Sequence, residues 1–118
     1  MTAAVYNLYI EQGATFQKTL TWKDSSGTPI NLTGYTARMQ FRRSAASSEV
    51  LYSATTENGA ITLGGAAGTI AIVISATATA AFTFGCAVYD LEVISSGGVV
   101  YRLLEGGVEL SLEVTRGA

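Results

Sequence analysis

The chain has 118 residues, the usual size of one folded domain, so we expect a single domain over residues 1–118. Hydrophobic residues make up 48% of the sequence, which is enough to bury a core and excludes a disordered chain. Only 14% of the residues are charged and the formal net charge is −2, so no positive field attracts phosphate and we expect no binding of nucleic acid.

The first third of the chain predicts three strands. Residues 5–10 form a short strand, and because no basic residue precedes this apolar run we expect no secretory signal peptide. In residues 15–22 every second side chain is apolar apart from Lys18, and in residues 35–42 every second side chain is apolar. A period of two is typical of strands with one buried face.

The middle of the chain predicts three further strands and a helical turn. Strands are expected at residues 50–53 and 61–63, with the turn signal Asn58-Gly59 between them. Isoleucine then occupies every second position from Ile70 to Ile74. No charge occurs between Glu57 and Asp90, a stretch long enough to span a membrane, but the period of two indicates a strand. We therefore expect no membrane span.

An alanine-rich segment follows the isoleucine strand. Ser75 can cap a helix, and the alanines of residues 76–81 favour one although the threonines among them do not. The sequence predicts one short helical turn that carries the chain from one sheet to the other.

The last third predicts a meander of three antiparallel strands at residues 86–95, 99–105 and 108–114. A three-residue loop at residues 96–98 joins the first two strands, and Gly106-Gly107 joins the last two as a hairpin. Inward-facing pairs are then apolar and charges meet outside. The predicted pairs are Leu91 with Leu103, Val93 with Tyr101, Glu92 with Arg102, Leu103 with Leu110, Tyr101 with Leu112, and Val99 with Val114.

Regular turns between short alternating strands predict the fold class. We expect an all-β protein, an antiparallel β-sandwich of immunoglobulin-like or jelly-roll-like type, with about eight strands and at most one short helix.

The sequence lacks the residues that most catalytic sites need. It contains no histidine and one cysteine, which excludes a Ser/His/Asp or Cys/His arrangement, a Cys/His zinc site and a disulfide within the chain. Cys86 stands in an apolar run, where a lone cysteine is usually a small buried hydrophobe. The prediction is a non-enzymatic protein without metal or cofactor.

One surface of the predicted meander is apolar enough to suggest a contact. By the register above, Val88, Ile94, Val100 and Leu104 project from the outer face beside Glu92 and Arg102. An apolar patch on the outside of a sheet usually meets a partner. We therefore predict these six residues as an interface; the alternative is that the segment after Ser75 or the N-terminal strand covers the patch within the same chain.

Trp22 has two interpretations. Its face-mates Phe16 and Leu20 are apolar, which favours a place in the sandwich interior. The alternative is a platform on which a sugar ring stacks.

Segments in the first third and in the last third of the chain carry a family resemblance. Residues 10–16 (Ile-Glu-Gln-Gly-Ala-Thr-Phe), 20–27 (Leu-Thr-Trp-Lys-Asp-Ser-Ser-Gly) and 29–35 (Pro-Ile-Asn-Leu-Thr-Gly-Tyr) resemble the N-terminal domains of upper baseplate and receptor-binding adaptor proteins of tailed bacteriophage. Residues 89–93, 97–106 and 113–116 are similar to the ends of small phage structural proteins. The resemblance implies a non-enzymatic component of the virion and transfers no binding residue.

The expected function is therefore that of a bacteriophage virion protein in the tail, baseplate or fibre attachment, assembled in the bacterial host cytoplasm. Its partners would be other virion proteins or further copies of itself in a symmetric assembly. Two alternatives stay open: a head decoration or neck protein, and a carbohydrate-binding module that uses Trp22 or exposed tyrosines.

Overall fold

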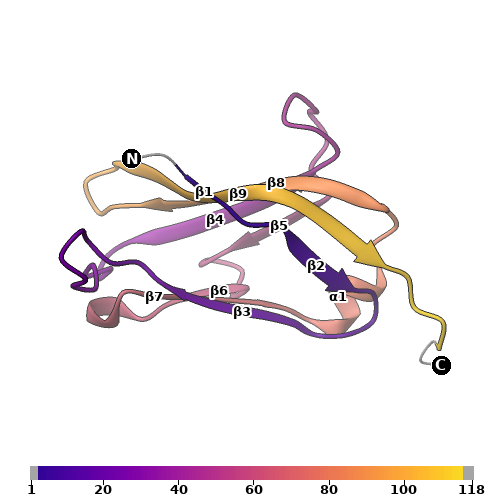
Figure 1. Cartoon of the computed structure of the whole chain (residues 1–118), viewed down its shortest axis with the longest axis horizontal. Helices are drawn as coiled ribbons and strands as arrows, with labels where there is room; N and C mark the ends of the chain where they lie inside the picture. The colour runs from indigo at the N-terminus through magenta and orange to yellow at the C-terminus, as the bar shows by residue number, and fades with distance from the viewer. Residues whose placement is uncertain (1–2, 116–118) are drawn as a thin grey trace.

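The computed structural model describes residues 3–115, which form two β-sheets packed face to face (Figure 1). The larger sheet has six strands, with β1 and β2 following each other along the same edge of β9. From that edge its strands are β1 (Ala4–Val5), β2 (Leu8–Glu11), β9 (Val100–Ser111), β8 (Cys86–Ile94), β4 (Thr36–Arg42) and β5 (Tyr52–Thr55). The smaller sheet consists of β3 (Phe16–Thr21), β7 (Thr69–Ile74) and β6 (Ile61–Leu63).

These pairings confirm the predicted class, an antiparallel β-sandwich with little helix. All strand pairs are antiparallel except those of β1 and β2, which run parallel to β9. The helical segments of the described chain are a 3₁₀ turn (Gly65–Ala67) and α1 (Ala76–Ala80).

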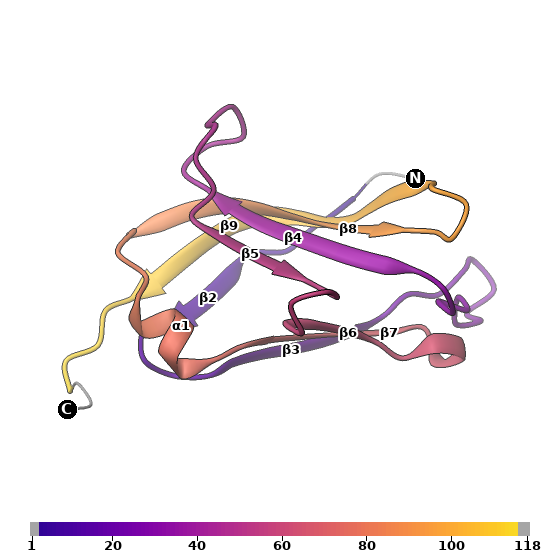
Figure 2. The same ribbon diagram turned by 180° about the vertical axis from the view of Figure 1, so that it is seen from behind.

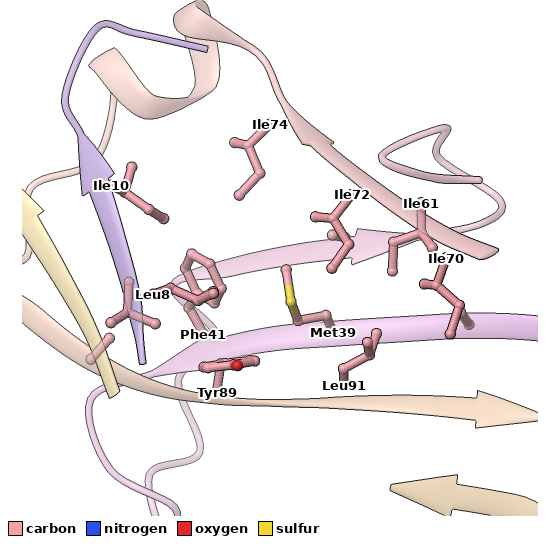
Figure 3. Packing of buried hydrophobic residues seen from close by; sticks show 14 of the residues in the cluster. Leu8, Ile10, Met39, Phe41, Ile61, Ile70, Ile72, Ile74, Tyr89 and Leu91 are labelled. Atoms are coloured by element: carbon pink, nitrogen blue, oxygen red, sulfur yellow. The ribbon is translucent and has the colours of Figure 1, made fainter. Parts of the chain in front are cut away.

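The core lies between the sheets and follows the alternation of the sequence. Ile70, Ile72 and Ile74 of β7 are fully buried, and they point toward Met39 and Phe41 of β4 (Figure 3). Burying each such side chain contributes about 1.5–3 kcal/mol. The alternating strands therefore supply the main stabilisation of the fold.

Helix α1 connects the two sheets, as predicted, and lies at one end of the sandwich (Figure 2). The hydroxyl of Ser75 accepts a hydrogen bond from the amide of Ala78 at 3.1 Å, which is the predicted N-cap. Thr79 is fully buried; its hydroxyl accepts from the amide of Gly13 and donates to the carbonyl of Ala14. The helix is thus tied to the turn between β2 and β3.

Two predicted strands have different bounds in the structure. The expected strand at residues 5–10 is interrupted at Tyr6 and Asn7, where β1 ends and β2 has not begun. The strand expected at residues 50–53 lies two residues later, as β5.

The predicted hairpin at Gly106-Gly107 is wrong, because both glycines lie inside the continuous strand β9. A Cβ on Gly106 would lie 2.5 Å from the carbonyl oxygen of Tyr6, so the missing side chain lets the N-terminal segment approach. The amide of Gly107 donates to the side chain of Asn7 at 2.9 Å. The glycines therefore serve a close approach of two backbones and not a turn.

The predicted residue pairs next to the loop at residues 96–98 are confirmed, whereas those that depend on a hairpin at Gly106-Gly107 are wrong. The three-residue loop is confirmed, since Ile94 pairs with Val100 and the amide of Ser95 donates to the carbonyl of Val99. The pairs of Glu92 with Arg102 and Val93 with Tyr101 are also confirmed.

Three further pairs are wrong because the residues belong to one strand or lie beyond its end: Leu103 with Leu110, Tyr101 with Leu112, and Val99 with Val114. The remaining pair is shifted, because a β-bulge at Leu91/Glu92 brings Leu104, not Leu103, opposite Leu91.

Candidate functional site

The outer face of the larger sheet carries two rows of polar side chains across β4, β8 and β9. Because the buried residues of β4 and β8 alternate with exposed or half-buried ones, the side chains between them point to the outside. The rows are Arg38, Glu92 and Arg102, and next to it Gln40, Asp90 and Glu105. An open groove of about 890 Å³ runs over this face.

The arginines and carboxylates of the groove neutralise one another. The Nε atom of Arg38 lies 2.8 Å from Oε1 of Glu92, and Arg102 lies 3.5 Å from both Asp90 and Glu105. Such exposed pairs each contribute about 0–1 kcal/mol to stability. They therefore organise the surface more than they hold the fold together.

The pKa of the Asp90 carboxyl is shifted by its surroundings in the groove. Partial burial raises the pKa of Asp90 above its ordinary value, and the charges of Glu92 and Glu105 raise it further, against the opposing effect of Arg102 and Arg38. The two carboxylates beside Asp90 each pair with an arginine, Glu92 with Arg38 and Glu105 with Arg102.

Arg42 also has partners within the chain. Its guanidinium donates to the side-chain oxygen of Gln40 and, at 2.6 Å, to the carbonyl of Ser47 in the loop after β4. All three arginines on this face therefore have hydrogen-bond or ion-pair partners within the chain, and the partners of Arg42 are neutral.

The predicted apolar patch is split by these charged rows. Ile94 and Val100 pair at the end of the β8–β9 hairpin, whereas Val88 lies beyond both charged rows, opposite Arg42. The four apolar residues therefore do not form one continuous surface. The cause lies in the sequence, because the outward positions between Val88 and Ile94 are Asp90 and Glu92, which are both charged.

Leu104 does not belong to the outer face in the way predicted. The bulge places it opposite Leu91, which is fully buried, and Leu104 packs against the core. Glu92 and Arg102 do face each other, but Glu92 binds Arg38 and Arg102 binds Asp90 and Glu105.

What remains of the patch is a small surface that we call the hairpin end, formed by Ile94, Val99 and Val100. Val99 is 51% exposed, Val100 is 47% exposed, and Ile94 is half-buried. Sequence reasoning missed Val99, which it placed inside opposite Val114. The misplaced hairpin at residues 106–107 caused that error.

The segments proposed as an internal cover lie elsewhere. β1 and β2 extend the sheet at the edge of β9, and α1 is bound to the turn at Gly13 and Ala14. The hairpin end is therefore not covered by either segment.

Trp22 packs with the interior. It is half-buried against the core, with its ring centroid 5.2 Å from that of Tyr101 and 6.5 Å from that of Tyr35. Both ring pairs are tilted or edge-on, the usual geometry of packed aromatic side chains. The arrangement agrees with the interior placement and not with a free platform for a sugar ring.

Cys86 differs from its prediction, since it is exposed at the start of β8. Its neighbour Ala87 takes the inward position instead. Over residues 3–115, no three or more Cys, Asp or Glu side chains gather closely enough to hold a metal ion. Within the same residues no helix has the length and apolar character needed to cross a membrane.

No protein-family model matches the chain, and no curated protein matches it. The fold itself is common, because 234 chains of solved structures match it, so the fold does not select one function. One of these is the voltage-gated sodium channel beta4 subunit, whose extracellular domains form parallel homodimers that explain its role in cell–cell adhesion. It is 12% identical, covers 97% of each chain and has a TM-score of 0.53.

At this level of identity the likeness shows the fold alone, an immunoglobulin-like β-sandwich. The division of strands agrees with it, since β9, β8 and β4 form one sheet and β3, β7 and β6 the other. The disulfide that joins the sheets of antibody domains is absent, because the chain has a single cysteine.

Proposed function

We propose that the protein is a non-enzymatic structural component of a tailed-bacteriophage virion, in the tail, baseplate or fibre attachment, and that it acts by packing against neighbouring chains. The resemblance of residues 10–35 to baseplate and adaptor domains supports the setting. The homodimers of the beta4 subunit support the idea that a sandwich of this type associates through its surface.

The observation that carries the proposal is the contrast on the outer face of the larger sheet. Its carboxylates are paired with arginines, whereas Val100 is 47% exposed on this face at the hairpin end, next to Val99, which is 51% exposed. One such side chain contributes about 1.5–3 kcal/mol when buried, so a contact of this size needs repetition in a symmetric assembly to be stable.

A double substitution tests the contact. Ile94→Asp with Val100→Asp should keep the β-type circular dichroism spectrum but lower the mass of the assembly in solution. Val50→Asp is the matched control, because Val50 is 40% exposed and lies outside the hairpin end. Unchanged assembly in the double variant would contradict the proposed contact.

The virion setting needs its own experiment. The chain should copurify with phage particles and be detected in them by mass spectrometry, and electron microscopy of the particles would separate a tail position from a head or neck position. Particles that lack the chain would contradict the setting without affecting the hairpin-end contact.

A further inference from the structure

Strand β3 is the longest strand at a free sheet edge in the described part of the chain. It pairs only with β7, and its six residues exceed the four of β2 and β5 and the three of β6. The edge of β5 is also closed from within: the side chain of Asn58 donates to the carbonyl of Ser53 and accepts from the amide of Thr55. Within residues 3–115, β3 has no such cover.

The backbone groups on the open edge can be identified from two hydrogen bonds. The amide of Trp22 donates to the carbonyl of Gly68 at 2.8 Å, and with the register of Phe16 opposite Ile74 this directs the even-numbered residues of β3 toward β7. On β7 the amide of Val73 donates to the carbonyl of Ala60, so the backbone groups of the odd-numbered residues of β7 point toward β6. The N–H and C=O groups of β3 that remain free belong to Gln17, Thr19 and Thr21.

Among the side chains of β3, only Lys18 is of a kind that hinders pairing with another strand. Natural edge strands usually carry lysine, proline or a bulge that repels another strand. The outward side chains of β3 are Gln17, Thr19 and Thr21, all exposed and uncharged. The one charge, Lys18, points inward, and its ammonium lies 3.7 Å from the ring centroid of Tyr6.

We propose that β3 pairs in antiparallel fashion with β3 of a second copy of this chain, about a two-fold axis at Thr19. In this register Thr19 faces Thr19, Gln17 faces Thr21, and Lys18 faces Leu20, so no like charges meet. If the partner strand slides so that Gln17 faces Thr19, Lys18 lies opposite Lys18, and this pair of like charges is destabilising. If it slides the other way, so that Thr19 faces Thr21, only residues 19–21 of the two β3 strands lie opposite each other.

The inference goes beyond the proposed function. It concerns the smaller sheet and stands whether or not the hairpin end forms a contact. The proposed pairing of β3 with β3 joins the three-stranded sheets of two copies into one sheet of six strands. A second copy fits the edge because, in an antiparallel pair of identical strands, the free N–H and C=O groups of each strand bond to the same groups of the other.

Disulfide trapping tests the register. In a Cys86→Ser background, Thr19→Cys should give a cross-linked dimer under mild oxidation, because a hydrogen-bonded antiparallel pair holds its Cα atoms about 5.5 Å apart, within disulfide range. Gln17→Cys combined with Thr21→Cys should also cross-link, whereas Thr21→Cys alone should not. Thr62→Cys, on an exposed position of β6, is the matched control.

A proline variant tests the hydrogen bonds themselves. Thr19→Pro removes an N–H that points to the open edge and spares the bonds to β7, so the β-type spectrum should persist while the dimer is lost; Thr19→Ser should keep the dimer. The proposal would be overturned if Thr19→Cys cross-linked no better than Thr62→Cys. That result would mean that the edge is either empty or paired with a strand of a different protein. If Thr19→Pro fails to fold, the cross-linking result decides.

Discussion

At the scale of single residues, Tyr6 and Asn7, which link β1 to β2, are bound by residues of β8 and of β9. The hydroxyl of Tyr89, whose side chain lies in the core (Figure 3), donates to the carbonyl of Tyr6 at 2.6 Å. Gly106 faces the same carbonyl, and Asn7 accepts from the amide of Gly107. These contacts connect residues 83 and 100 positions apart, which explains why the sequence pattern around the two glycines indicated a local turn instead.

Alanine substitutions of the two glycines should differ in effect. A Cβ at position 106 meets backbone at 2.5 Å, so Gly106→Ala should lower the free energy of unfolding by about 1–3 kcal/mol. At Gly107 the nearest atom lies at 3.7 Å, an ordinary contact, and Gly107→Ala should be tolerated. Denaturant unfolding measures both variants; equal stability of the two would show that β1 does not approach β9 as described.

Tyr89 predicts a change of stability at alkaline pH. Burial, with a smaller effect of Tyr6, raises the pKa of the Tyr89 hydroxyl from 10.0 to about 12. The folded chain therefore holds this proton more tightly than the unfolded chain, and the associated stability is complete below pH 10 and lost as the pH rises through about 12.

Tyr89→Phe should be about 0.5–1.5 kcal/mol less stable than the wild type at neutral pH, because it lacks the hydrogen bond to Tyr6. Its stability should then fall less steeply than that of the wild type above pH 10. Thermal melts at a series of pH values give both slopes, and parallel slopes would contradict a buried Tyr89 hydroxyl.

At the scale of elements, strands with one buried face were predictable and the long last strand was not. β3, β4 and β7 show their alternation in the sequence because a period of two reports burial directly. The bulge at Leu91/Glu92 leaves no such signal, and it turned Leu104 inward. The outer-face site was therefore predicted in part: the pairing of Glu92 with Arg102 was found, and the separation of Val88 from Ile94 by charged rows was not.

Helix α1 provides a test at the same scale. Thr79→Val keeps the shape of the side chain but leaves the amide of Gly13 and the carbonyl of Ala14 without their partner, so the free energy of unfolding should fall by about 1–3 kcal/mol. Thr77→Val, on an exposed position of the same helix, should change it by less than about 0.5 kcal/mol. Similar losses in both variants would mean that helix propensity, and not the tie to the β2–β3 turn, determines the effect.

At the scale of the whole molecule, the two sheets present different surfaces. The larger sheet shows paired charges with an apolar hairpin end, and the smaller sheet shows an uncharged face with an open edge at β3. A chain with 14% charged residues and a net charge of −2 has little electrostatic repulsion to keep copies apart. Both surfaces favour contacts between protein chains over chemistry on a small molecule.

The mass of the purified protein in solution, measured by sedimentation over a wide range of concentration, tests the central claim of assembly most directly. The account predicts masses that are multiples of 12.3 kDa and rise with concentration. A single species of 12.3 kDa at every concentration, for a protein with a β-type spectrum, would contradict it.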